Sequence, residues 1–172
     1  MSAIREMPRF DRRVAGEGVG EELATERLRE GLSYEWRAER HIEAVLCGVS
    51  DRRLSPDVAS RLIELAAAAR ARRTRLERRL KALGAGPRLA AIPPLLERVD
   101  QAIEVALASA RASADRYAAL AELSRRLADP ETAFACELNR IGAEESALVL
   151  EGLLALEVDR RARKTMESGG RR

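Results

Sequence analysis

The apolar residues of this chain recur every three or four positions in four separate stretches, and this spacing limits the folds open to it. In the first stretch it joins Leu28, Leu32, Ile42 and Leu46. Residues three and four apart share one face of an α-helix, so each stretch predicts a helix with one buried side. Aromatic residues make up only 3% of the chain, which argues against strands. The sequence therefore predicts an all-α protein.

Proline and glycine mark where these helices begin and end. Ser55 before Pro56, and Asp129 before Pro130, are typical helix starts, with a capping side chain ahead of a proline in the first turn. Gly84 is placed as a helix stop. The predicted helices span about 21–46, 56–83, 95–127 and 130–157. Four helices of this length predict a four-helix bundle.

The two ends of the chain lack the helical period. We expect a flexible N-terminal arm over 1–20, the bundle over 21–157, and a basic disordered tail over 158–172. The net charge is +3, and residues 157–172 hold six basic and three acidic side chains, so the remainder is close to neutral. A neutral body argues against a nucleic-acid-binding face. The tail is expected to be solvated, with contact to an anionic protein partner as the alternative.

Compartment and redox state follow from what the chain does not contain. No apolar run approaches the ~20 residues of a membrane span, and no signal peptide opens the sequence. Cys47 and Cys136 have neither CxxC spacing nor a neighbouring histidine, so we expect two buried, reduced thiols. These features predict a cytoplasmic protein with no membrane contact.

Charged residues interrupt the apolar faces. Glu35 and Glu39 continue the stripe of the first helix, and Glu145 falls on the predicted stripe of the fourth. That fourth stripe is formed by Phe134, Leu138, Ile141 and Leu148 and continues through Leu153 and Leu156. In the second helix, four arginines crowd one turn, so at least one is expected to face the core. They are Arg70, Arg72, Arg73 and Arg75.

The order of these elements resembles the ferritin-like, rubrerythrin-type superfamily of di-iron four-helix bundles. The resemblance covers about residues 21–157. It rests on the Leu83-Gly84 ending, on Tyr117, and on the stretch that runs from Asp129-Pro130 to Glu145. Active members take one lone Glu and one Glu-x-x-His from each half of the bundle. The spacing places carboxylate and imidazole on one face, around two irons.

Most of these ligands are replaced in this chain. By the resemblance, Glu35 matches the lone Glu of the first helix. Glu145 matches the Glu of the last motif, whose His position holds Leu148. The second-helix motif falls on 70–73, where both ligand positions are arginine, and the acidic position of the third helix falls on small residues. The chain's single histidine, His41, lies one position off its stripe and is expected to be structural.

Two carboxylates out of six ligands cannot hold a di-iron pair, so we expect no metal, cofactor or catalytic residue. Unpaired buried carboxylates are costly. The sequence therefore predicts a buried polar cluster of Glu35, Arg70, Arg73 and Glu145, in which arginine supplies the charge that iron supplies elsewhere. The alternative is that these side chains reach solvent. Under a metal-binding alternative, with iron or manganese, the ligands would be Glu35, Glu39 and Glu145, with His41 as a further candidate.

The order of the helices in space has two solutions. In the ferritin topology the second and third helices are parallel, so the link 84–93 must travel the length of the bundle. The helix 56–83 is roughly 40 Å long, whereas ten extended residues reach about 33 Å. An up-down-up-down bundle is easier to link. The ferritin-like order is favoured because the link is rich in proline and apolar residues, which suits an extended strap.

Three functions remain open on the sequence. The first is a non-catalytic bundle acting through oligomerisation or partner binding, with a homodimer face that includes Trp36, Val45, Val149 and Leu150. The second is a metal-binding oxidase or storage protein with an altered site. The third is a bundle that binds a small apolar ligand beside the small residues 106–114 of the third helix.

Overall fold

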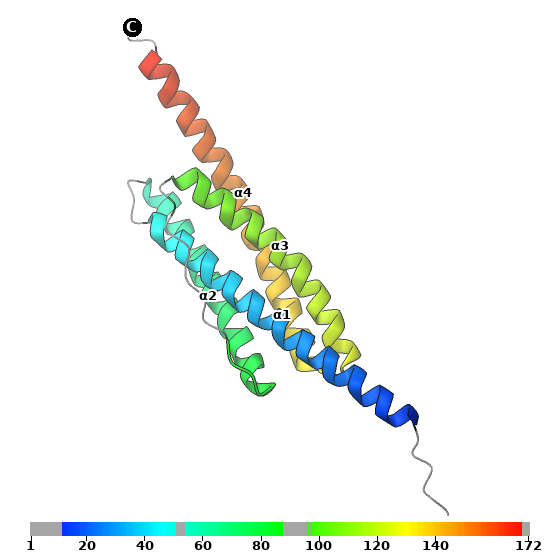
Figure 1. The fold of residues 1–172 in the computed structure, drawn as a ribbon. Coiled ribbons are helices and arrows are strands. Elements are labelled where there is room, and N and C mark those ends of the chain that lie inside the picture. Colours follow the sequence, from blue (N-terminus) through cyan, green and yellow to red (C-terminus); the bar gives the residue numbers. More distant parts are fainter. Residues whose placement is uncertain (1–11, 51–53, 88–95, 97, 170–172) are drawn as a thin grey trace, which may run out of the picture.

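The computed structural model describes residues 12–50, 54–87, 96 and 98–169. These residues form four α-helices and no strand: α1 Arg12–Ser50, α2 Pro56–Ala82, α3 Val99–Arg126 and α4 Pro130–Gly169. Figure 1 shows an elongated bundle in which the start of α1 and the end of α4 project at opposite ends. The predicted all-α four-helix bundle is confirmed.

The direction of each helix follows from contacts along its length. α1 and α2 are antiparallel, because Arg29 in the first half of α1 donates to the carbonyl of Leu83 just after α2, whereas the last turns of α1 pack with Leu62 near the start of α2. α1 and α3 are also antiparallel, since Gly31 lies against Leu120 near the end of α3, whereas Ile103 near its start packs with the last turns of α1. α2 and α3 therefore run parallel. This is the ferritin-like order that the sequence favoured.

Both terminal helices are longer than predicted. α1 begins at Arg12, inside the predicted arm, and α4 continues to Gly169, through most of the predicted tail. These end turns project beyond the rest of the bundle, and their sequence shows no apolar period. Residues with high helix propensity, such as Glu and Arg, nevertheless continue the helix. The remaining parts of the predicted arm and tail, 1–11 and 170–172, lie outside the described residues.

α2 and α3 end with the same backbone motif. Gly84 follows α2 with a φ of 70°, and Ala128 follows α3 with a φ of 54°. In each case the next N–H returns to the helix: Ala85 donates to the Leu80 carbonyl at 2.8 Å, and Asp129 to the Ser124 carbonyl at 2.9 Å. This 6→1 bond is the Schellman motif. The predicted stop at Gly84 is confirmed.

A polar layer divides the core into two apolar halves. One half surrounds Leu46, Leu62 and Ile103, and the other surrounds Leu28 and Leu76. Between them each helix contributes buried polar side chains. These are Glu35, Glu39, Arg72, Ser113, Asn139 and Ser146. The layer crosses the middle of the bundle, where its side chains are surrounded by all four helices.

The predicted buried face of α4 is wrong. Of its stripe, Phe134, Leu138, Ile141, Leu148 and Leu156 are exposed, as is Glu145, whereas Leu153 is buried. The buried stripe instead consists mostly of small and polar residues with the same spacing, namely Cys136, Asn139, Ala143, Ser146 and Ala147, followed by Leu150. Small side chains allow α4 to approach its neighbours closely. Periodicity could not choose between two stripes of equal spacing.

Candidate functional site: a buried arginine–carboxylate layer

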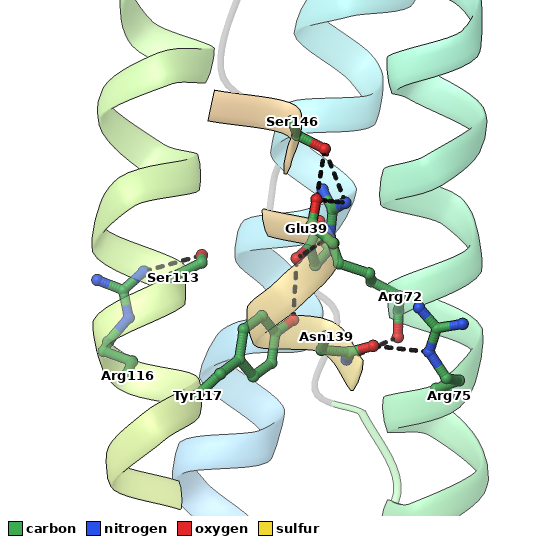
Figure 2. A network of polar contacts seen from close by, with 9 residues as sticks. Glu39, Arg72, Arg75, Ser113, Arg116, Tyr117, Asn139 and Ser146 are labelled. Carbon is green, nitrogen blue, oxygen red and sulfur yellow. Dashed lines mark hydrogen bonds and ion pairs between the residues drawn. The ribbon is translucent and has the colours of Figure 1, made fainter. Parts of the chain in front are cut away.

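Arg72 is the centre of the polar layer. Its side chain is fully buried, at 1% exposure. Its Nε donates to Glu39 Oε1 on α1 at 2.8 Å. Its Nη1 donates to the Gly142 carbonyl at 2.9 Å and to Ser146 Oγ at 3.0 Å, both on α4. Figure 2 shows the guanidinium held between these partners. One side chain of α2 thus connects three helices.

Tyr117 joins α3, the remaining helix, to this centre. Its hydroxyl donates to the same oxygen, Glu39 Oε1, at 2.9 Å, so Glu39 accepts from α2 and α3 together. Burial, followed by the nearby charges of Glu39 and Glu35, raises the pKa of Tyr117 well above its usual range. The phenol therefore keeps its proton and remains a hydrogen-bond donor.

A second ion pair lies one turn away along α1. Glu35 is completely buried and pairs with Arg116 of α3, whose side chain is 37% exposed and also donates to Ser113 Oγ at 3.2 Å. Burial raises the pKa of Glu35 above its ordinary 4.5, and the hydrogen bond from Arg116 opposes that shift. The layer thus holds two carboxylates and two guanidinium groups.

Asn139 fixes the side of the layer between α2 and α4. Its Oδ1 accepts from Arg75 Nε at 2.7 Å, and its Nδ2 donates to the backbone carbonyl of Arg72 at 3.3 Å. The amide therefore positions the arginine turn of α2 against α4, as Figure 2 shows for Asn139, Arg75 and Arg72.

The predicted cluster of Glu35, Arg70, Arg73 and Glu145 does not form. Arg70 and Arg73 both contact Glu43, at 2.6 Å and 3.2 Å, near the bundle surface. The side chain of Arg70 is 65% exposed, and Glu145 is exposed on α4. Of the four, only Glu35 belongs to the polar layer.

The second-helix error is one of register. The resemblance to a Glu-x-x-His motif predicted that the side chains at positions 70 and 73 face the core. The apolar spacing of Leu65, Ala69 and Leu76 instead places Arg72 on the buried face. That spacing was the available signal for Arg72. Sequence reasoning missed Arg116, because it lies between two predicted buried positions and reaches Glu35 only through its long side chain.

The cysteines, the histidine and the predicted dimer face have mixed outcomes, because one of the two thiols expected to be buried is exposed and most of the dimer face is in the core. Cys136 is buried, as expected, and burial raises its pKa to about 12. Cys47 is exposed. His41 is partly buried and its Nδ1 has no hydrogen-bond partner among the described groups. Three of the four residues predicted as a homodimer face, Trp36, Val45 and Leu150, are buried in the core.

The residues of the layer do not fit a di-iron pair. Glu35 and Glu39 are each bonded to an arginine, and no imidazole makes a hydrogen bond in the layer as described. Arg72 carries a permanent positive charge inside the layer, bonded to Glu39. Within the described ranges, no three His, Cys, Asp or Glu side chains are grouped so that they could hold one metal ion. A cation beside Arg72 would meet electrostatic repulsion.

The small residues of α3 divide between the core and the surface, where Ala114 lines an open groove of about 400 Å³ beside α4. Ala106 and Ala110 are completely buried and pack with Leu46, Leu62 and Leu150 in the first apolar half of the core. Their size allows close packing of helices at that level. Across the part of the chain that the structure describes, no helix is long and apolar enough to span a membrane.

Comparison with known proteins supports the fold. No family model and no curated protein matches the sequence. Among solved structures, a protein from Xanthomonas campestris pv. campestris is 21% identical with a TM-score of 0.73, over 83% of this chain and 99% of the other. Dps from Thermosynechococcus elongatus is 16% identical with a TM-score of 0.70, over 78% and 94%.

A third solved structure is a dodecameric thioferritin, the bacterioferritin-related protein of Bacteroides fragilis. It is 18% identical with a TM-score of 0.64, over 84% of this chain and 90% of its own. At these identities the likeness concerns the fold and not the activity. Together with the parallel arrangement of α2 and α3, it shows that this chain has the ferritin-like four-helix-bundle fold.

Proposed function

We propose that this protein is a rubrerythrin-type ferritin-like bundle in which a buried arginine stands in place of the metal centre. It acts through self-assembly or partner binding and not through catalysis. The observation that carries this proposal is the position of Arg72, which is buried in the polar layer and hydrogen-bonded to Glu39 and Ser146.

Charge balance is the physical argument. A buried carboxylate is tolerated only when an opposite charge or several hydrogen bonds compensate its lost hydration. Glu39 receives bonds from Arg72 and Tyr117, and Glu35 pairs with Arg116. The guanidinium keeps its charge at every physiological pH. The layer is thus neutralised by side chains alone.

The likeness to a dodecameric thioferritin supports the assembly part of the proposal, and we expect a homo-oligomer in the cytoplasm. The basic C-terminal segment is a weaker candidate for partner binding than the sequence suggested. Arg160 pairs with Glu157, and Arg161 pairs with Asp100 of α3. Part of the basic charge is therefore already matched within the chain.

A second candidate is a ferritin-like protein with an altered iron or manganese site, and one observation favours it. Glu35 Oε2 and Glu39 Oε2 are both buried and lack a hydrogen-bond partner among the described groups. Carboxylate oxygens are ligand atoms for these metals. Binding there would require Arg72 or Arg116 to move away from its carboxylate.

Metal analysis separates the two candidates. The full chain is purified from cells grown with added iron or manganese, and its metal content is measured by mass spectrometry beside Glu39→Gln and the exposed α1 control Glu30→Gln. If Arg72 takes the place of the metal, the metal content should be well below one ion per chain and should be the same in the wild type and both variants. One metal per chain that is lost in Glu39→Gln and kept in Glu30→Gln would establish the second candidate instead.

A further inference from the structure

One face of α4 carries a ridge of large apolar side chains that no helix of the described chain covers. The ridge consists of Phe134, Leu138, Ile141, Leu148 and Val149, which are 66%, 39%, 44%, 69% and 39% exposed. α4 packs on α3 and α2 through its other faces. Contiguous exposed apolar residues of this size mark interaction surfaces in soluble proteins.

A groove runs beside the ridge, between α2 and α4. Its volume is about 360 Å³, and its lining includes the small residues Ala68, Ala71 and Gly142. Glu145 and Val149 line it from the ridge side. Ridge and groove are therefore neighbours on one face of the molecule.

The charges on this face are complementary. Glu145 lies within the ridge, between Ile141 and Leu148. Arg75 lines the groove, and its Nε bonds the neutral amide of Asn139. Within the described ranges, neither Glu145 nor Arg75 has an ion-pair partner, whereas Arg61 in the same groove pairs with Glu64. An unmatched acid and an unmatched base thus occupy the same face.

We propose that a second copy of this chain binds here, with the two α4 helices antiparallel about a two-fold axis at Ile141. The two ridges then pack against each other, and the two grooves face each other beside them. Such an isologous interface requires a surface that is complementary to itself. An apolar ridge packed on its own copy, with Glu145 of each copy facing the groove residue Arg75 of the other, meets that requirement. The proposal rests on the assembly part of the proposed function and identifies the surface that performs it.

The register follows from the spacing along α4. Phe134 and Leu148 each lie seven residues from Ile141, roughly 10 Å along the helix. An axis at Ile141 therefore sets Phe134 of one copy against Leu148 of the other. It also sets Glu145, four residues past the axis, near level 137 of the second copy, close to where Arg75 bonds Asn139. A parallel pair would instead bring the two Glu145 side chains together.

Interface size explains why the groove is needed as well as the ridge. A standard stable interface buries about 800 Å² on each partner. Five partly exposed side chains supply less than this. The same axis brings the groove of each copy opposite the groove of the other, so the α2 residues that line it add surface from both copies.

The first test is the oligomeric state of the full chain by sedimentation velocity up to roughly 100 µM. The wild type is expected to be at least dimeric. Ile141→Arg places two like charges at the axis and is expected to raise the dissociation constant of this contact at least about tenfold. The matched control is Ile63→Arg, at an exposed apolar position of α2 outside the groove lining, which is expected to assemble as the wild type does.

A strictly monomeric wild type, or an Ile141→Arg protein that assembles as tightly as the wild type, would overturn the proposal. Circular dichroism checks that each variant is folded. Charge exchange supplies a second measurement: Glu145→Arg is expected to weaken assembly, and the added change Arg75→Glu to restore it. If the double variant Glu145→Arg with Arg75→Glu assembles as weakly as Glu145→Arg alone, Glu145 and Arg75 do not form an ion pair between the two copies.

Cysteine cross-linking tests the register without a disruptive substitution. The background is Cys47→Ser, and Cys136 remains buried with a pKa of about 12, so it does not react. Ile141→Cys is expected to form a disulfide with its own copy across the axis. Leu148→Cys, displaced by roughly 10 Å on each side, is expected to form none. The reverse result would overturn the antiparallel register.

These outcomes are independent of the metal measurement. If the protein binds stoichiometric metal and also cross-links at position 141, the proposal that Arg72 replaces the metal is refuted and the proposed interface is still supported. If the protein is a metal-free monomer, the interface is refuted and the replacement of the metal by Arg72 is still supported.

Discussion

At the scale of single residues, the function of the polar layer depends on Arg72. The guanidinium donates to three acceptors, and Glu39, the acceptor on α1, also accepts from Tyr117. Arginine suits this position because its planar donors are fixed relative to each other and its charge is permanent. The bonds reach α1 and α4 from a single position on α2.

Removing that charge is expected to be costly. Arg72→Met leaves Glu39 buried without its counter-charge and should lower the free energy of unfolding by about 3–5 kcal/mol. The added change Glu39→Gln removes the orphaned charge, so the double variant should recover part of the loss, with a coupling of roughly 1–3 kcal/mol. The measurement is urea unfolding by circular dichroism at one fixed protein concentration.

Arg70→Met is the matched control on the same turn, and its effect should be small because the Arg70 side chain is mostly exposed. The prediction is contradicted if Arg70→Met and Arg72→Met lower the free energy of unfolding equally, or if the effects of Arg72→Met and Glu39→Gln are additive. Either result would show that the buried Arg72–Glu39 pair does not stabilise the layer.

The raised pKa of Glu35 predicts a specific pH dependence. The folded protein binds this proton more tightly than the unfolded chain does, because burial raises the pKa above its ordinary 4.5. Its contribution to stability is therefore complete below pH 4.5 and is lost as the pH rises toward the folded-state pKa. Glu35→Gln should consequently gain stability relative to the wild type as pH rises through this window.

The measurement is the difference in unfolding free energy between Glu35→Gln and the wild type, taken at several pH values from 4 upward. The difference cancels contributions from Asp100 and Asp129, whose pKa values are lowered by their own hydrogen bonds and arginine neighbours and which act in the opposite sense. Glu30→Gln, exposed on α1, is the control. A difference that falls as pH rises would contradict the assignment.

At the scale of helices, the ends of α2 and α3 form a natural comparison. Both use a residue with positive φ, yet one is Gly84 and the other Ala128. The left-handed region places Cβ too close to the following carbonyl in every residue except glycine. The alanine at the end of α3 is therefore a local cost that the chain tolerates.

Exchanging these residues should shift stability in opposite directions. Ala128→Gly should raise the free energy of unfolding by about 1 kcal/mol, and Gly84→Ala should lower it by about the same amount. Nothing lies within 4 Å of a Cβ added at Gly84, so the effect there isolates the backbone. Thermal unfolding of the two single variants is the measurement. Two shifts of the same sign would contradict the shared motif.

At the scale of the whole molecule, two antiparallel helix pairs meet face to face. α1–α2 and α3–α4 are the tightly packed pairs. They join mainly through α1 and α3, and more loosely through α2 and α4. The close approach of α1 to α3 depends on Gly31, because a Cβ there would lie 2.5 Å from Leu120 Cδ2. The loose side contains the groove beside the α4 ridge.

A large residue at position 31 should therefore separate the two pairs. Gly31→Leu is expected to lower the free energy of unfolding by about 1–3 kcal/mol through overpacking. Gly20→Leu, on the same helix where nothing lies within 4 Å of an added Cβ, should have little effect. Denaturant unfolding compares the two. Equal stability of both variants would show that Leu120 can move aside without cost.

The amino-acid sequence by itself determined the elements and their order. Apolar spacing, the starts at Pro56 and Pro130, and the stop at Gly84 are local signals, and the structure confirms each of them. The period of α1 also placed Glu35 and Glu39 on its apolar stripe, and both are buried in the structure. Local sequence decides such features because they depend on a few neighbouring residues.

Only the tertiary structure decided which of several faces each helix buries, and which charges therefore meet. On α2, neighbouring arginines point in directions about 100° apart, and packing selected Arg72 over Arg70 and Arg73. On α4, packing against α3 and α2 selected the stripe of small residues and left the larger apolar stripe outside. Close approach of two helices favours small side chains between them, even where larger side chains would bury more surface. That preference depends on how the two helices pack and cannot be read from the sequence of one helix alone.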